Sequence, residues 1–285
     1  MRLLGLSMVV VALAQTPTFR TDIERVQVDV SATRGGRPVV GLSAADFVVT
    51  DNGVAQRVES VQVGDAPLDV QIVLDTSGSV SGARLQRLID ASLGLVAALG
   101  DADRAGLITF ATAVEAKVPL TTDRDRVRRA LTAVGGGVGA TSLRDAVQLA
   151  VATPSAGDAR VLVLVFSDGD DTMSWLRASD VIESARRSSV VVHSVTVGGS
   201  GAPSTAQFRA ALADAAGGRV FSASSDSDLA RLFTSALDEM RARYRLTFTP
   251  RPAGVPGWHE LAVKTRGAGI DVKARAGYVV NLPLK

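Results

Sequence analysis

The chain has 285 residues, 46% of them hydrophobic and 21% charged, which excludes a disordered protein and allows a globular one with a buried core. Lys and Arg total 31 and Asp and Glu total 29, and a net charge of +2 without runs of like charge argues against a nucleic-acid partner. Cysteine is absent and His193 and His259 are the only histidines, so disulfides, thiolate sites and multi-histidine sites are excluded. Any metal site must be built from oxygen ligands.

Residues 1–14 have the pattern of a secretory signal peptide. Arg2 supplies a positive charge, an apolar run of about 11 residues follows, and Ala12-Leu13-Ala14 forms a small-x-small cleavage site. The run is shorter than the roughly 20 residues of a membrane-spanning helix, so a retained anchor is the weaker interpretation, and a buried N-terminal element is a further alternative. Cleavage would leave Gln15 first in a chain of 285 − 14 = 271 residues, and we expect a periplasmic or secreted protein without a lipidated cysteine.

Residues 22–66 and 243–282 both show short strand patterns. Residues 26–33 alternate apolar and polar side chains, and the turn signal Asp51-Asn52-Gly53 precedes a further expected strand at 54–63. Tyr244, Leu246 and Phe248 repeat the period of two near the C-terminus. Because each flank alone is too small for a stable sheet, we expect the two flanks to pair into one small accessory β domain.

Residues 68–242 alternate short apolar runs with helical periodicities, which is typical of a mostly parallel sheet covered by helices on both faces. The expected strands are residues 70–74, 106–110, 161–166, 190–197 and 219–221, with an antiparallel edge strand at 114–120. The expected helices are residues 84–99, 124–134, 143–153, 178–187, 204–216 and 226–241. The predicted fold class is therefore α/β, with a doubly wound six-stranded sheet inserted between the flanks.

Polar side chains follow two of the expected strands. Asp75, Ser77 and Ser79 come directly after the first strand, and Asp168 follows the run at 161–166. If the strand order is the common 3-2-1-4-5-6, these strands are neighbours and the two carboxylates face each other at the switch point, where doubly wound sheets bind ligands. Thr141 adds a third hydroxyl from a Gly-rich loop before a helix.

The residues Asp75-x-Ser77-x-Ser79, Thr141 and Asp168-Gly169 resemble the metal-ion-dependent adhesion site of von Willebrand factor A (VWA) domains. The five positions are spread over three loops in the expected order. In the flanks, Asp51-Asn52-Gly53 with Gln56, and Tyr244-x-Leu-x-Phe-x-Pro250, look like the exported "VWFA-related" proteins of Acidobacteria. The resemblance implies the Rossmann-like VWA fold for residues 68–242 and extends over nearly the whole mature chain.

The resemblance also implies a role for each residue of this motif. Ser77 and Ser79 would bind a divalent cation directly, and Thr141, Asp75 and Asp168 would bind it directly or through water. Hydroxyl and carboxylate oxygens suit Mg²⁺ or Mn²⁺ and can accept Ca²⁺. A partner protein would complete the coordination with the carboxylate of an Asp or Glu, so the expected function is protein binding and not catalysis.

Several residues allow alternative interpretations. Asp75 and Ser77 could instead cap a helix starting near Ser81, but that accounts for one loop and not three. Asp170 and Asp171 either strengthen cation binding by their charge or form a solvated acidic turn before a helix. Trp175 is either an exposed contact at the rim of the site or, as is more common, packed against the helix that follows.

Two other functions compete with metal-dependent protein binding. In a structural module the ion would only stabilise the loops. A hydrolase would use Ser200 in Gly198-Gly199-Ser200-Gly201 with His259 as base, although an ordinary loop fits that segment better. His193, inside a Val-rich strand, is expected to be a buried, hydrogen-bonded histidine, and the glycines at 135–139 lack the lysine of a phosphate-binding loop.

Overall fold

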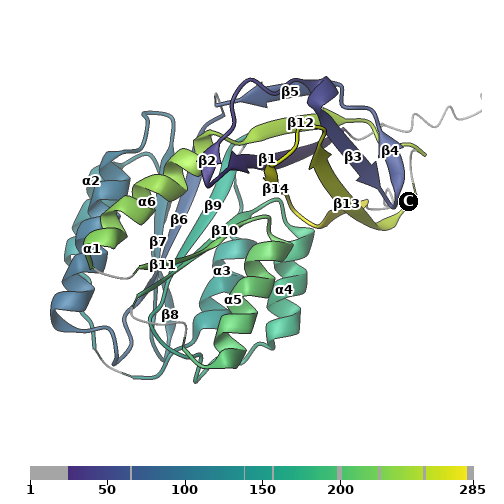
Figure 1. Cartoon of the computed structure of the whole chain (residues 1–285). Coiled ribbons are helices and arrows are strands. Elements are labelled where there is room, and N and C mark those ends of the chain that lie inside the picture. Colours follow the sequence, from purple (N-terminus) through teal and green to yellow (C-terminus); the bar gives the residue numbers. More distant parts are fainter. Residues whose placement is uncertain are drawn as a thin grey trace, which may run out of the picture.

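A computed structural model gives the fold of the chain. It describes residues 25–280 except 65, 138, 156, 198–200, 224–225 and 253–254. Outside the described residues lie the expected signal peptide at 1–14, Gln15, which would be the first residue after cleavage, and Ser200. Figure 1 shows an α/β part at the lower left and a group of smaller sheets at the upper right.

A six-stranded sheet forms the centre of the α/β part, in the order β11-β10-β9-β6-β7-β8. Its strands are β6 (Leu68–Asp75), β7 (Arg104–Phe110), β8 (Val114–Thr121), β9 (Arg160–Phe166), β10 (Val191–Val197) and β11 (Val220–Ala223). All neighbours are parallel except β8, which runs antiparallel to β7 at the edge, as expected. Counted from β6 the order is 3-2-1-4-5-6, so β6 and β9 are neighbours at the switch point.

Helices cover both faces of this sheet, which explains why every residue of β6 and of β9 is buried. The helices are α1 (Gly82–Ala97), α2 (Arg124–Thr132), α3 (Leu143–Ala152), α4 (Ala178–Arg187), α5 (Pro203–Ala215) and α6 (Asp226–Arg241). α1, α2 and α6 contribute to one apolar core and α3, α4 and α5 to the other (Figure 1). Each begins and ends within two residues of its predicted position.

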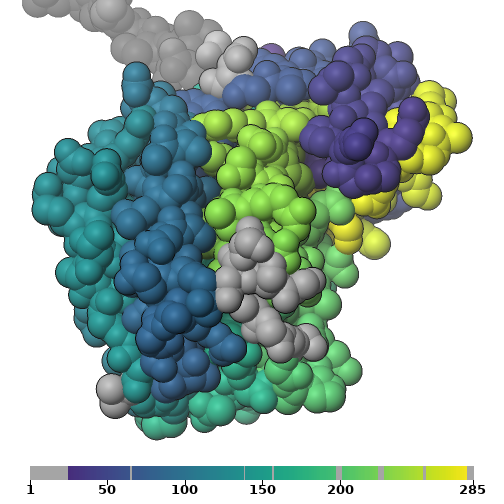
Figure 2. Space-filling model, turned by 60° about the vertical axis from the view of Figure 1, so that its left-hand side comes forward, coloured from purple at the N-terminus to yellow at the C-terminus, as the bar shows by residue number. Residues whose placement is uncertain are grey.

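The flanks form two antiparallel sheets, so the predicted fold class is confirmed. One has the order β14-β1-β12-β5, with β2 beside β1, and the other β15-β13-β3-β4. The strands are β1 (Val26–Arg34), β2 (Arg37–Pro38), β3 (Phe47–Asp51), β4 (Val54–Gln56), β5 (Ser60–Val63), β12 (Tyr244–Phe248), β13 (Gly257–Thr265), β14 (Asp271–Lys273) and β15 (Gly277–Val280), with a 3₁₀ turn at Ala44–Asp46. In Figure 2 the purple N-terminal and yellow C-terminal segments lie against each other.

The expected strand at 54–63 is two strands and not one. β4 pairs with β3 in one flank sheet, whereas β5 pairs with β12 in the other. The chain crosses between the sheets at 57–59, where the Glu59 N–H already bonds to the carbonyl of Thr247 at 2.8 Å. The residues at 54–63 are compatible with a single strand, and their pattern contains no signal for the change from one sheet to the other.

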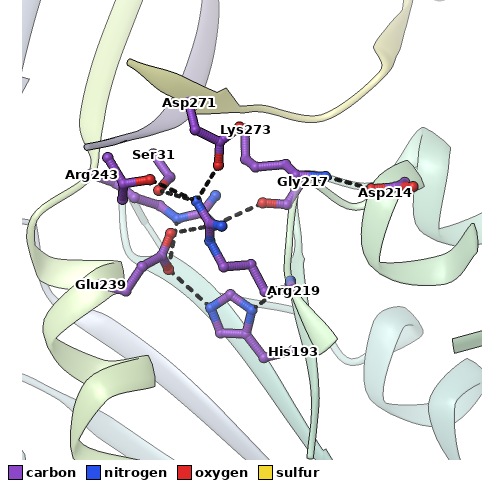
Figure 3. Close-up of polar contacts among 10 residues, drawn as sticks. Ser31, His193, Asp214, Gly217, Arg219, Glu239, Arg243, Asp271 and Lys273 are labelled. Carbon is purple, nitrogen blue, oxygen red and sulfur yellow. Dashed lines mark hydrogen bonds and ion pairs between the residues drawn. The ribbon is translucent and has the colours of Figure 1, made fainter. Parts of the chain in front are cut away.

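A buried polar cluster connects β10 and α6 with the flank sheets (Figure 3). His193 Nδ1 accepts the backbone N–H of Arg219 at 2.9 Å, and its Nε2 lies 2.9 Å from the Glu239 carboxylate. Arg243 donates to both oxygens of Glu239 at 2.9 and 3.2 Å. The Arg219 side chain reaches Asp271 of β14 at 3.2 Å. His193 is therefore a fully buried, hydrogen-bonded histidine with a structural role, as its position in a Val-rich strand predicts.

Candidate metal centre

The loops after β6 and β9 meet because these strands are neighbours in the sheet. Leu74 is in register with Phe166, so the residues that follow each strand emerge at the same edge. Asp75 ends β6, and Asp168 follows β9 after a single intervening residue, Ser167. The strand order therefore brings together two carboxylates that are 93 positions apart in the sequence (168 − 75).

Asp75 is fully buried and both of its carboxylate oxygens have partners. Oδ1 accepts the backbone N–H of Ser77 at 2.9 Å, and Oδ2 accepts the hydroxyl of Ser167 at 2.7 Å. Burial raises the pKa of Asp75, the nearby charge of Asp168 adds to this, and the hydrogen bonds from Ser77 and Ser167 act in the opposite direction. The side chain is therefore held in one orientation next to a second negative charge.

Ser77, Ser79 and Asp168 continue the contacts that start at Asp75. The hydroxyl oxygens of Ser77 and Ser79 are 3.4 Å apart, and the Ser79 hydroxyl donates to Asp168 Oδ1 at 2.8 Å. Ser77 is buried while Ser79 is exposed, so the group reaches from the interior to the surface. Four of the five predicted ligands thus form one continuous chain of short contacts.

Thr141 joins this group through its loop. Its backbone N–H donates to the Thr172 hydroxyl at 3.0 Å, and its carbonyl accepts the N–H groups of Thr172 and Met173 at 2.9 and 3.1 Å. The Gly78 N–H bonds to the carbonyl of Gly139 at 3.2 Å. The loop that carries Thr141 therefore touches both the loop of Ser77 and Ser79 and the segment after Asp168.

Gly139 is required for this approach of the loops. Its φ is +98°, which L side chains rarely adopt, and an added Cβ would lie 2.3 Å from the Thr112 hydroxyl oxygen. That hydroxyl accepts the Ala140 N–H at 3.0 Å. Gly139 thus allows the close packing of the loops beside the site.

The alternative that Asp75 and Ser77 cap a helix does not match the contacts. α1 starts at Gly82 with Ser81 as its N-cap, and no side chain caps it. The hydrogen bonds of Asp75 go to Ser77 and Ser167, which lie in the two loops of the site.

Asp170 and Asp171, which follow Asp168, both accept hydrogen bonds from neighbouring segments. Asp171 accepts the Arg144 backbone N–H at 2.8 Å and the Ser174 hydroxyl at 2.6 Å. Burial, the largest effect, raises the pKa of Asp171, but the hydrogen bonds from the Arg144 guanidinium at 3.1 Å, the Ser174 hydroxyl and the two backbone N–H groups hold this pKa below its usual value. Asp170 accepts the N–H of Ala202. Both side chains thus fasten the loop.

Trp175 is 92% exposed, so the expectation that it packs against the following helix is wrong. Its backbone N–H and that of Leu176 are held by the Asp145 carboxylate at 2.9 and 3.0 Å. The backbone is therefore fixed while the indole ring projects into solvent beside the loop of Asp168.

Three residues of the site were not found from the sequence. Ser167 holds Asp75, the guanidinium of Arg84 on α1 pairs with Asp168 Oδ2, and Arg209 on α5 donates to the carbonyl of Gly169 at 2.8 Å. Ser167 precedes Asp168 directly, so its position offered a signal. Arg84 and Arg209 are ordinary helix residues in the sequence, and only the fold brings them to the loops.

The residues fit a hard divalent cation by their chemistry and spacing. Adjacent ligands of an octahedral ion with bonds of about 2.1 Å are about 3 Å apart, close to the 3.4 Å between the hydroxyl oxygens of Ser77 and Ser79. Within the described part of the chain, no group of three or more His, Cys, Asp and Glu side chains is placed to hold a metal. A site at Asp75 and Asp168 must therefore use the hydroxyls.

The model of the von Willebrand factor type A domain family matches residues 69–235. The chain belongs to this family. No curated protein matches the chain by sequence. Domains of this family are generally interaction modules and not enzymes.

Solved structures agree with the fold. A von Willebrand factor type A protein from Catenulispora acidiphila matches with a TM-score of 0.54 at 13% identity, covering 92% of this chain and 76% of that one. BatB, a conserved hypothetical protein from Bacteroides thetaiotaomicron, matches with a TM-score of 0.50 at 18% identity, covering 61% and 98%. Proximal thread matrix protein 1 from the mussel byssus, with a zinc-occupied MIDAS motif, matches with a TM-score of 0.55 at 16% identity. That match covers 65% of this chain and 48% of the mussel protein.

No helix in the described ranges is long and apolar enough to cross a membrane.

Proposed function

We propose that Asp75, Ser77, Ser79, Thr141 and Asp168 hold one divalent cation, with Mg²⁺ preferred and Mn²⁺ or Ca²⁺ as alternatives. The observation that carries this proposal is the continuous chain of contacts from Asp75 through Ser77 and Ser79 to Asp168. Oxygen ligands alone, two of them charged, are the set that such ions prefer. The zinc-occupied motif of the mussel protein supports a divalent ion at this place in the fold.

We infer further that this site binds an acidic group of a partner protein. When bound, the ion supplies an electrophilic centre with a free position that takes the carboxylate of an Asp or Glu. Ser77 and Ser79 would contribute neutral oxygens as direct ligands, and an ion that Asp75 and Asp168 hold through water would stay electrophilic. Ser79 is exposed, so its side of the site is open to an incoming protein.

We propose that the protein is an interaction module and not an enzyme. The competing hydrolase would need His259 as a base, but its Nδ1 lies 2.7 Å from the Asp51 carboxylate and its Nε2 lies 2.7 Å from the Val255 carbonyl. His259 is also 3% exposed, within the flank sheets. Both ring nitrogens are thus engaged in holding β13 to its neighbours, which argues against a role in catalysis.

We propose that the protein is exported, with residues 1–14 removed and the mature chain periplasmic or released. The support is the sequence pattern of charge, apolar run and small residues. Mass spectrometry of the intact protein from its own cells tests this. A chain that starts at Gln15 supports cleavage, whereas Met1 retained in a membrane fraction supports an anchor.

Titration calorimetry with MgCl₂ and MnCl₂ tests the metal site. We expect the mature protein to bind one ion and Asp75→Ala to bind none, with circular dichroism showing that the variant stays folded. Asp101→Ala is a matched control, because Asp101 is an acidic residue with a fully exposed side chain that pairs only with Arg124 among the contacts described. Equal binding by Asp75→Ala and the unaltered protein would contradict the site.

A second experiment, with and without metal, distinguishes partner binding from a function in which the ion only stabilises the loops. Affinity capture from the source organism, with Mg²⁺ and with chelator, should yield a partner that is lost on chelation and with Asp75→Ala. An ion that raises the melting temperature without any chelator-sensitive association would favour the structural module.

A further inference from the structure

Arg84 contributes a positive charge to the site that the five predicted ligands do not explain. Its guanidinium Nη1 pairs with Asp168 Oδ2, while the Ser79 hydroxyl donates to Asp168 Oδ1. The side chain of Asp168 is 4% exposed and that of Arg84 is 39% exposed. Both oxygens of a proposed metal ligand are therefore engaged, one of them by a cation from the protein itself.

The position of Arg84 allows its guanidinium to leave. Arg84 lies in the first turn of α1, and the neighbouring Leu85 is buried in the core and fixes the helix. The backbone is thus held, while the long and partly exposed side chain can rotate toward solvent. Arg209 differs, because it is 2% exposed and donates to the Gly169 carbonyl from within the protein interior.

A guanidinium and a divalent cation would both offset the negative charge of Asp168. Asp75 and Asp168 are two negative charges close enough to affect each other, and Asp75 is fully buried. A positive charge beside them reduces this repulsion. Because Arg84 occupies Asp168 Oδ2, a cation that uses the same oxygen has to displace it.

We propose that Arg84 is an internal competitor of the divalent cation: it pairs with Asp168 in the metal-free protein, and the ion displaces it to the surface. This inference rests on the proposed metal site and concerns its regulation. Arg84 keeps the loop of Asp168 in place without metal and lowers the affinity for the ion. The site consequently fills only at a metal concentration that overcomes this ion pair.

Calorimetry with MgCl₂ on the full mature chain tests the competition. We expect Arg84→Gln to bind Mg²⁺ about two- to fivefold more tightly than the unaltered protein, the range of a partly exposed ion pair. Arg124→Gln is the matched control, since Arg124 also lies in the first turn of a helix and pairs with Asp101 at 3.1 Å. It removes the same charge away from the site and should leave the affinity unchanged.

Modification by phenylglyoxal, mapped by mass spectrometry, provides a second measurement that does not depend on affinity. Mg²⁺ should increase the reaction of Arg84 in the unaltered protein, leave Arg124 unchanged, and have no effect on Arg84 in Asp75→Ala. Metal binding by the unaltered protein with equal or weaker binding by Arg84→Gln, or without a change in Arg84 reactivity, would overturn the competition and leave the proposed function standing. No binding by either protein would overturn both.

Discussion

The Ser167 hydroxyl donates a hydrogen bond of 2.7 Å to the carboxylate of Asp75, across 92 positions of sequence. Ser167 is 3% exposed and lies directly before Asp168, so it connects the ends of β6 and β9. We expect Ser167→Ala to leave a buried carboxylate oxygen without this donor. The free energy of unfolding should fall by about 1–2 kcal/mol, and the affinity for Mg²⁺ should fall about tenfold because Asp75 loses its fixed orientation.

Ser92→Ala is the matched control for Ser167→Ala. Ser92 is fully buried and donates to the Leu88 carbonyl at 2.7 Å within α1, away from the loops. Urea unfolding and calorimetry on both variants separate stability from binding. If Ser92→Ala weakened Mg²⁺ binding as much as Ser167→Ala, the loss would reflect stability alone and Ser167 would have no positioning role.

The exposure of Trp175 predicts that its side chain matters little for stability. With 92% of the residue exposed, Trp175→Ala should change the free energy of unfolding by less than about 0.5 kcal/mol. In Trp258→Phe, where Trp175 is the remaining tryptophan, acrylamide should quench fluorescence nearly as well as it quenches free tryptophan. Weak quenching would show that the indole is packed after all.

The sequence predicted the structure well where a residue type fits only one kind of environment. Runs such as 161–166 consist of apolar residues alone, which suit a strand covered on both faces, and β9 is buried throughout. Asp75 and Asp168 could be assigned to one site because the carboxyl ends of parallel neighbours meet at the same edge of the sheet. The strand order itself was taken as the common one for doubly wound sheets, and the structure has this order.

The sequence was not informative where a long or amphipathic side chain had several possible environments. Nothing in the sequence of their helices marks Arg84 or Arg209 as part of the site, and their contacts with the loops depend on the packing of α1 and α5. For Trp175 the sequence allowed an exposed contact at the rim or the more common packed position, and in the structure Asp145 fixes its backbone while the ring is exposed. The division of 54–63 into β4 and β5 depends on which partner strand is nearer, which is a tertiary property.

His193 predicts a loss of stability on mild acidification. Burial, the largest effect, lowers the pKa of His193 below its usual 6.5, although Glu239 acts to raise it, and Nδ1 accepts the Arg219 N–H and so carries no proton. The folded protein keeps this ring neutral while the unfolded chain takes up a proton below about pH 6.5. The free energy of unfolding should therefore fall as the pH decreases through that value, by about 1 kcal/mol between pH 7 and 5.5.

Urea unfolding at several pH values, with His193→Gln for comparison, measures this contribution. The variant has no imidazole at this position, so its stability should depend less on pH over the same interval. Glu239 acts at lower pH: burial raises its pKa, but Arg243 and His193 outweigh this and hold the pKa far below 4.5, so its contribution is lost only in stronger acid. An identical pH dependence of both proteins would contradict this prediction, because it would show that His193 takes up its proton over the same pH range in the folded protein as in the unfolded chain.

The pairing of β1 with β12 predicts that residues 22–66 and 243–282 unfold as one unit. Val28 faces Leu246 in register, and both are buried in one apolar cluster with Phe248. Leu246→Asp places a charge in this cluster, which is costly without a partner. Hydrogen exchange should then show lost protection in β1 as well as in β12, while β6 and β9, in the unit proposed for residues 68–242, remain protected.

Thr247→Asp is the control for a charge in the same strand, because alternation along β12 places its half-buried side chain on the opposite face. It should leave the protection of β1 largely unchanged. Protection of β1 that survives Leu246→Asp would mean that the two flanks do not form a shared domain. Equal loss of protection in β6 and β9 would mean instead that the flanks and the α/β part unfold together as one cooperative unit. Contacts between them, such as the 3.2 Å ion pair between Arg160 and Asp29, would then be the cause. In that case the boundaries at 68 and 242 would be wrong.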